Sequence, residues 1–260
     1  MSDIFEYLGY ISRFYDSNQR LKTLAGYPFY VESDSIKKCV NKINPIDKAL
    51  AYGDNAFYYF KKGFYYNCAG EYKKASESLT KAIQLAPETV RYLFARSTSY
   101  YHLKEYSKSL KDANEAIKLD KYNWRALQQR AQIYLRNKKI DLAETDLLNA
   151  LIYIDSNRLL EKTYFQLANI NLSIKFYFKK ATDYLNKAIE LNNSNAYYWF
   201  LLSTSLIGNH DCSYVDSMKK YLELCETKGS CNKNRIDLAL QSIKKKSTLC
   251  YEKIIKEKNK

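Results

Sequence analysis

Hydrophobic and polar residues follow one another along this chain with the period of amphipathic helices, and the pattern repeats. Residues 70–87 read GEYKKASESLTKAIQLAP, and residues 104–121 read KEYSKSLKDANEAIKLDK, which restates the first stretch thirty-four residues later. Within each stretch the apolar positions step by three and four, as they do on one face of an α-helix. Polar breaks such as residues 67–70 divide each unit into two helices of roughly 13 residues. Repetition at a fixed interval predicts a stack of like structural units.

Small and aromatic residues keep this register through three units. Ala82, Ala116 and Ala150 lie thirty-four residues apart. The same interval relates three further sets: Gly63, Ser97 and Ala131; Tyr66, Tyr100 and Tyr134; and Ala75, Ser109 and Ala143. A fourth unit has its alanine at Ala188, thirty-eight residues after Ala150, so we expect the extra residues near 155–162. A fifth unit is looser, with Trp199 in its first helix and residues 211–224 as its second.

These positions resemble the tetratricopeptide repeat family, whose signature places W-x2-L-G-x2-Y before A-x3-F and then A and P. The first unit matches this signature at Tyr59, Gly63, Tyr66, Ala75, Leu79, Ala82 and Pro87. The resemblance covers residues 54–226 and implies an all-α fold, a right-handed α-α superhelix (solenoid) of about five helix-turn-helix repeats with helical caps. We expect an N-terminal helical extension or cap at 1–53, the repeat array at 54–226 and a basic C-terminal capping helix at 227–260.

Three interpretations of residues 1–53 stay open: a decayed extra repeat, an N-terminal cap, or a segment that folds back into the concave groove of the repeat array. Residues 35–43 are the clearest helix within them, and we expect it to end before Asn44-Pro45. If this segment folds back, it would cover the phenylalanines of the first unit.

The resemblance also implies a binding surface, because in this family the first helix of each pair lines a concave groove. By register, the expected groove residues are Phe57, Phe60, Lys61, Phe64, Arg91, Phe94, Thr98, Tyr101, His102, Arg125, Gln128, Gln129, Gln132, Arg136 and Gln166. The set contains no Asp or Glu, which favours an acidic or carboxylate-bearing peptide or helix as the partner. We expect the arginines to orient this partner and the aromatic residues to provide apolar anchors.

The 260-residue chain carries a formal net charge of +14, which also favours an acidic partner: nucleic acid, a lipid surface or an acidic protein. A basic patch lies at Lys244, Lys245 and Lys246, although a solvated helix face explains it equally well. The first residues do not resemble a signal peptide, and no apolar run is long enough to span a bilayer. The six cysteines form no CxxC pair and no compact framework. We therefore expect a cytoplasmic, non-secreted protein without a membrane span.

Catalytic signatures are absent from the sequence, which has no GxxxxGK[ST], GxGxxG, HExxH or GxSxG motif. We expect no enzyme activity, no cofactor and no metal site, and a scaffold or adaptor within a multiprotein complex as the function. One alternative is an RNA- or ribonucleoprotein-associated factor that uses the basic surface. Another is a co-chaperone that lacks the carboxylate clamp known in this family. The clamp positions here hold Phe60, Phe64, Ala95, Arg125 and Gln129, of which only Arg125 retains a matching side chain.

Overall fold

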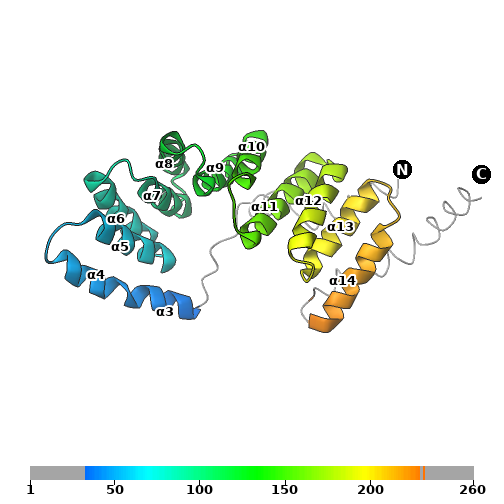
Figure 1. Ribbon diagram of the computed structural model, residues 1–260, viewed down its shortest axis with the longest axis horizontal. Helices are drawn as coiled ribbons and strands as arrows, with labels where there is room; N and C mark the ends of the chain where they lie inside the picture. The colour runs from blue at the N-terminus through cyan, green and yellow to red at the C-terminus, as the bar shows by residue number, and fades with distance from the viewer. Residues whose placement is uncertain (1–32, 229–230, 232–260) are drawn as a thin grey trace, which may run out of the picture. The chain divides into compact units, whose positions relative to one another are not determined.

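The computed structural model describes residues 33–228 and Cys231, and these residues form helices and turns without a strand. The helices are α3 (Ser33–Asn41), α4 (Ile43–Leu50), α5 (Ala56–Cys68), α6 (Tyr72–Leu85), α7 (Val90–His102), α8 (Tyr106–Leu119), α9 (Trp124–Arg136), α10 (Ile140–Leu151), α11 (Asn157–Ile170), the π-helix η1 (Asn171–Lys175), α12 (Phe178–Leu191), α13 (Ala196–Gly208) and α14 (Tyr214–Lys228). They fall into two compact units: one contains α3 to α10, and the other contains α11 to α14 (Figure 1).

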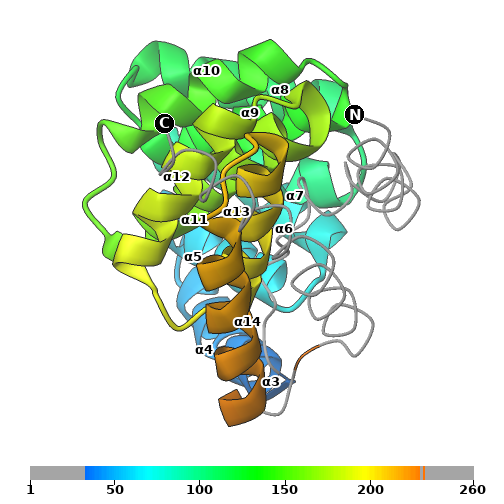
Figure 2. The same cartoon turned by 90° about the vertical axis from the view of Figure 1, so that its right-hand side faces the viewer.

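Each unit is built from helix-turn-helix pairs, as the thirty-four-residue pattern predicts. The first unit contains the pairs α5–α6, α7–α8 and α9–α10, and the second contains α11–α12 and α13–α14. Figure 2 shows the last of these pairs, with α14 alongside α13. The all-α fold of repeated pairs is therefore confirmed. The proposed domain limits at residues 53 and 226 stay predictions.

Small residues allow the two helices of a pair to approach closely. A Cβ atom on Gly63 would lie 2.5 Å from Cγ of Leu79, so only glycine fits there without movement of α6. In the second pair, the Ser97 and Ser109 hydroxyls each donate to the backbone carbonyl of the other residue at 2.8 Å. These reciprocal bonds satisfy both buried hydroxyl groups. In the third pair, the equivalent positions hold Ala131 and Ala143, which have no side-chain polar group to satisfy.

Every pair turns through one residue in the left-handed region. The five turn residues have φ between +56° and +81°: Gly70, Lys104, Lys138, Phe176 and His210. After the first of them, the amide of Glu71 donates to the carbonyl of Tyr66 at 2.9 Å, which satisfies a carbonyl at the end of α5. The equivalent bonds follow Lys104, Lys138 and His210. The repeat is therefore a repeat of backbone geometry as well as of side chains.

The extra residues of the fourth repeat lie between the start of its first helix and the start of its second. Helix α11 begins at Asn157, thirty-three residues after the start of α9 at Trp124. Helix α12 begins at Phe178, thirty-eight residues after the start of α10 at Ile140. The additional residues therefore lie between Asn157 and Phe178, an interval that contains the π-helix η1. The expected position near 155–162 overlaps the start of this interval and stays a prediction.

Two short helices precede the first complete pair. The expected end of the helix before Pro45 is only partly right, because α3 ends at Asn41 and α4 starts at Ile43. Pro45 is the third residue of α4, where its missing N–H has no partner within the helix to lose. Both helices contact α5, and Lys62 of α5 pairs with Asp47 of α4 at 2.6 Å.

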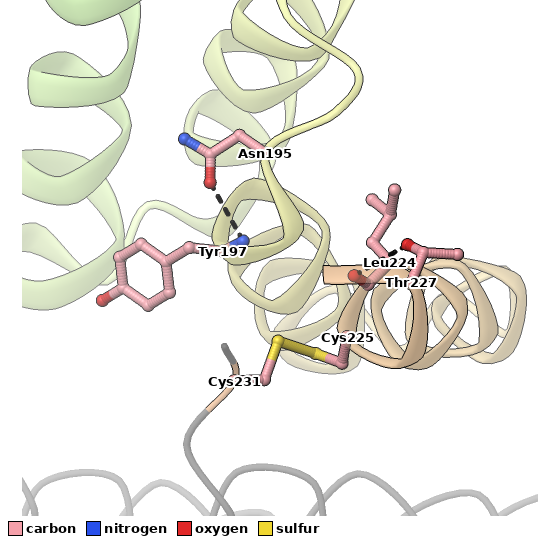
Figure 3. The surroundings of a disulfide bond; sticks show 6 residues. All are labelled: Asn195, Tyr197, Leu224, Cys225, Thr227 and Cys231. Atoms are coloured by element: carbon pink, nitrogen blue, oxygen red, sulfur yellow. Dashed lines mark hydrogen bonds between the residues drawn. A yellow bond between two sulfur atoms is a disulfide. The ribbon is translucent and has the colours of Figure 1, made fainter. Parts of the chain in front are cut away.

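Disulfides stabilise both units, contrary to the absence of a framework that the cysteine spacing indicated. Cys39 of α3 is bonded to Cys68 at the end of α5, and their Cα atoms are 6.1 Å apart. Cys225 of α14 is bonded to Cys231, as Figure 3 shows beside the Asn195 cap of α13. Cys212 is disulfide-bonded too, and no cysteine in the described part of the chain is a free thiol. Sequence spacing missed the Cys39–Cys68 pair because packing of α3 against α5 brings these two cysteines together.

Candidate partner-binding surface

The first helices of the three pairs in the first unit contain no carboxylate. Helices α5, α7 and α9 each comprise 13 residues, and none includes Asp or Glu. They contribute seven cations: Lys61, Lys62, Arg91, Arg96, Arg125, Arg130 and Arg136. We call the exposed and half-buried side chains of these three helices the first-helix surface. Its electrostatic character depends on which of the seven cations are neutralised by neighbouring helices.

Two of the cations are held by carboxylates of the second helices. The Arg96 guanidinium donates to both oxygens of Asp112, from Nε at 2.8 Å and from Nη2 at 2.9 Å. Thirty-four residues later, Arg130 makes the same bidentate contact with Asp146, with both distances 2.8 Å. These arginines also reach the preceding second helix, where Thr80 and Asn114 accept from Nη1. They therefore bind three helices together and serve the fold.

A third cation, Lys62, pairs with Asp47 of α4. The remaining four cations of the first-helix surface have no carboxylate partner among the described residues. Each lies against an aromatic ring instead. The cation-to-centroid distances are 5.2 Å for Lys61 and Phe57, 6.0 Å for Arg91 and Phe60, 4.1 Å for Arg125 and Trp124, and 5.9 Å for Arg136 and Tyr101. A ring orients a cation without neutralising its charge, so these four remain available to an anion.

The aromatic residues of α5 divide into exposed and buried members. Phe57 is 48% exposed and Phe64 is 51% exposed, so both present apolar surface to solvent. Phe60 is only 7% exposed, because it stacks on Tyr92 of α7 with ring centroids 5.0 Å apart. Phe60 is therefore part of the core, contrary to the expected groove position. Phe94 of α7 is half-buried.

The end of α7 forms a second aromatic cluster. Tyr101 is buried, contrary to expectation, and its hydroxyl accepts from Nε of Arg136 at 3.0 Å. The His102 imidazole stacks on Tyr72 of α6 with centroids 4.3 Å apart. Burial of this imidazole, reinforced by the charge of Arg136, lowers the pKa of His102 below its ordinary range. His102 is therefore neutral near pH 7, and Arg136 supplies the positive charge of this cluster.

The predicted polar positions are more buried than their register suggests. Thr98, Gln128 and Gln132 are half-buried, whereas Gln129 is buried and its Oε1 lies 3.4 Å from the Thr98 hydroxyl. Gln166 is buried as well and belongs to α11, in the other compact unit. Gln129 and Gln166 are therefore core residues, and the expectation that they are exposed is wrong. Arg91 and Arg125 are exposed, as expected.

Sequence reasoning missed the Arg96 and Arg130 networks, although their signal was present. Both arginines, and their partners Asp112 and Asp146, recur at the same thirty-four-residue interval. The basic patch at Lys244–Lys246 and the capping helix at 227–260 lie outside the described residues, except for residues 227, 228 and 231. In the described part of the chain, no cluster of His, Cys, Asp and Glu has the arrangement of a metal site. Nor is any helix there long and apolar enough to cross a bilayer.

Comparison with known sequences identifies one repeat and two partial relatives. A family model described as tetratricopeptide repeat matches residues 58–89. Outer dynein arm-docking complex subunit 4 of Xenopus laevis is 42% identical over 62 residues, or 24% of this chain and 12% of that protein. Sperm-associated antigen 1 of Mus musculus is 30% identical over 111 residues, or 43% of this chain and 11% of that protein. The chain thus spans about a tenth of the length of these relatives.

Solved structures share the fold at low sequence identity. The C-terminal part of a tetratricopeptide repeat protein from Cytophaga hutchinsonii superposes with a TM-score of 0.68 at 13% identity, covering 84% of this chain and 86% of that one. YrrB, described as a TPR protein with an unusual peptide-binding site, gives 0.60 at 14% identity, with 76% and 97% covered. PilF of Pseudomonas aeruginosa gives 0.61 at 19% identity, with 77% and 85% covered.

Proposed function

We propose that this chain, a member of the tetratricopeptide repeat family, is a non-catalytic scaffold or adaptor that holds an acidic segment of a partner protein on its first-helix surface. The partner segment is an extended peptide or a helix that bears carboxylates beside apolar side chains. Its carboxylates pair with Arg91, Arg125 and Arg136, and its apolar side chains contact Phe57 and Phe64. The protein then works as one subunit of a multiprotein complex.

The observation that carries this proposal is the uneven distribution of carboxylates between first and second helices. The described second helices α6, α8 and α10 contain six acidic residues: Glu77, Asp112, Glu115, Asp141, Glu144 and Asp146. The first helices α5, α7 and α9 contain none. Arginines without carboxylate partners form strong, bidentate hydrogen bonds to a carboxylate that arrives from outside. Exposed phenylalanines of α5 supply the apolar contact that a peptide needs for affinity.

Charge reversal tests the proposal directly. The tagged protein and its Arg125→Glu variant would be used to capture partners from an extract of the cells that produce this chain. We expect the variant to recover the specific partners at a level lower by about tenfold or more, because it places like charges together. Lys81→Glu and Lys111→Glu, on exposed positions of α6 and α8, are matched controls and should capture the partners normally. Unchanged capture by Arg125→Glu, with helical circular dichroism intact, would remove the first-helix surface from consideration.

The same capture distinguishes the two alternative functions. Nuclease treatment and a second, higher salt concentration separate protein partners from RNA, because binding to phosphates falls steeply with salt. Recovery of RNA that nuclease or salt abolishes would support the ribonucleoprotein alternative. Recovery of heat-shock chaperones through their C-terminal carboxylate would support the co-chaperone alternative. Phe60 and Gln129, which occupy clamp positions here, are buried and do not favour that outcome.

The disulfides bear on where the protein works. Structural disulfides persist in oxidising compartments and are rare in cytosolic proteins. We therefore propose an oxidising compartment in place of the cytoplasmic location expected from the sequence. Alkylation of thiols in the denatured, unreduced protein from its own cells should leave Cys39, Cys68 and Cys225 unlabelled in mass spectra. Labelling of all three without reduction would restore the cytoplasmic location.

A further inference from the structure

The turn between α11 and α12 differs in residue type from the four equivalent turns of the chain. In those four turns, the left-handed residue and its successor are Gly70-Glu71, Lys104-Glu105, Lys138-Lys139 and His210-Asp211. In the fourth repeat, the same two positions hold Phe176-Tyr177. The repeats serve as internal controls, because all five turns place one residue in the left-handed region. The other four turns meet this requirement with glycine, lysine or histidine, so it does not explain an aromatic pair.

Phe176 also occupies a backbone conformation that a bulky residue adopts at a cost. Its φ of +56° lies in the left-handed region, where the Cβ atom of an L-residue crowds the backbone. Glycine meets this requirement without that cost, as Gly70 does in the first repeat. A strained conformation that the fold does not require is a reason to look for a function of the side chain itself.

The turn is longer than its counterparts, and the π-helix η1 leads into it. The amide of Tyr177 donates to the carbonyl of Asn171, six residues earlier, at 2.8 Å. In the other four turns, the corresponding bond reaches back five residues, as from Glu71 to Tyr66. Extra length and the aromatic pair thus occur together, in the same turn. π-Helical segments are frequently found at functional sites.

The side chains of the aromatic pair are about half exposed, while the base of the turn is fixed. Phe176 is 51% exposed and Tyr177 is 53% exposed. The carbonyl of Phe178 accepts a hydrogen bond from the Ser205 hydroxyl at 2.6 Å, which attaches the turn to α13. Gly208 leaves room for the Phe178 ring, since a Cβ atom there would lie 2.4 Å from that ring. Phe178 therefore anchors the turn, and Phe176 and Tyr177 remain on its outside.

The surroundings of this pair are cationic. No Asp or Glu occurs between Glu161 and Asp183, an interval that includes four lysines: Lys162, Lys175, Lys179 and Lys180. The ammonium groups of Lys175 and Lys180 lie 5.8 Å and 5.6 Å from the centroid of the Tyr177 ring. Lys179 and Lys180 are exposed. We call residues 175–180 the aromatic tip.

We propose that the aromatic tip inserts into the surface of a membrane that contains anionic lipids. Phenylalanine and tyrosine at an exposed turn can occupy the headgroup region, where an apolar ring and a polar hydroxyl are both accommodated. Lysines around them attract anionic headgroups, and their long stems keep the charge at the interface. A protein partner would instead have to provide a pocket for both rings, whereas a lipid interface can receive an exposed aromatic pair without one.

Vesicle flotation tests this binding, with vesicles of phosphatidylcholine alone and of phosphatidylcholine mixed with phosphatidylserine. The full chain should float with the mixed vesicles and not with the neutral ones, and added salt should weaken the binding. The variant with Phe176→Gly and Tyr177→Glu introduces the residues of the first turn, Gly70-Glu71. Its binding should fall by about tenfold or more, because it loses both inserted rings. The variant should melt no earlier than the wild type, since glycine relieves the left-handed strain.

Two further variants separate the tip from other surfaces. Lys179→Glu combined with Lys180→Glu should weaken binding to the mixed vesicles, whereas Lys111→Glu, at an exposed position of α8, should leave it unchanged. Failure of the wild type to float with anionic vesicles would overturn the proposal. Equal flotation of the tip variant would do so as well. Capture of a protein that requires Phe176 and Tyr177, with no vesicle binding, would assign the tip to a protein partner instead.

Discussion

At the scale of single residues, Lys138 shows how one backbone angle determines the cost of a turn. Its φ is +59°, and its side chain is exposed. Any Cβ atom is disfavoured in this left-handed conformation, and glycine removes the penalty. We predict that Lys138→Gly raises the free energy of unfolding by about 0.5–1 kcal/mol, the larger flexibility of unfolded glycine offsetting part of the gain. Urea denaturation followed by circular dichroism measures the change.

The adjacent residue is a matched control for this prediction. Lys139 precedes α10 with φ −89° and ψ 70°, which is on the ordinary side of φ for L-residues. Glycine has no steric advantage there and adds conformational entropy to the unfolded chain. Lys139→Gly should therefore lower the free energy of unfolding. An increase for both variants would refute the explanation from the left-handed turn.

At the scale of helices, each repeated arginine network joins the two helices of its pair through a buried ion pair and reaches the preceding pair through Nη1. The Asp146 carboxylate is only 4% exposed, and Arg130 donates to both of its oxygens. Arg130→Ala leaves this buried charge without its partner, so we predict a loss of about 3 kcal/mol in the free energy of unfolding. Lys118→Ala, which breaks an exposed pair with Glu115, should cost about 0.5 kcal/mol or less. Chemical denaturation of both variants provides the comparison.

Replacing both partners distinguishes the loss of the ion-pair attraction from the cost of leaving one buried charge without a partner. Changing both partners, Arg130→Met with Asp146→Leu, removes the buried charge together with its cation. This double variant should be more stable than Arg130→Ala, because apolar groups of similar volume often replace a buried ion pair at little cost. A double variant as unstable as Arg130→Ala would show that the network itself, through Asn114, determines the packing of the three helices.

Much of the helical framework could be predicted because it depends on local periodicity. Apolar steps of three and four residues predicted the helices, and the thirty-four-residue interval predicted their pairing. The same interval could not locate the insertion within the fourth repeat, because counting from Ala150 to Ala188 gives the number of extra residues but not their position. Confining the extra residues to the interval between Asn157 and Phe178 required knowledge of where α11 and α12 begin.

Contacts between distant helices were the part that sequence could not supply. Phe60 and Gln129 occupy register positions of a groove, yet neighbouring side chains such as Tyr92 and Thr98 bury them. The Cys39–Cys68 disulfide depends on α3 reaching the end of α5, which no spacing rule predicts. Exposed Arg91 and Arg125 were predicted correctly, because their environment is determined by the helix face alone.

At the scale of the whole molecule, the chain is a repeat protein whose helices divide into two compact units at residues 154 and 155. In such proteins each pair is stabilised by its neighbours, so a local defect weakens the surrounding helices first. The first-helix surface belongs to the unit with α3 to α10, and the aromatic tip belongs to the unit with α11 to α14. The two proposed binding functions therefore depend on the integrity of different units.

This division predicts that cavities in the two units have separate consequences. Leu147 of α10 and Leu185 of α12 are both fully buried, one in each unit. Leu147→Ala and Leu185→Ala should each lower stability by about 3 kcal/mol within their own unit, through lost burial and the cavity left behind. Hydrogen exchange resolved by peptide should show lost protection in residues 56–151 for the first variant and in residues 157–228 for the second. Equal loss across both ranges in either variant would mean that the chain unfolds as one cooperative unit, because a defect in one part would then be felt throughout.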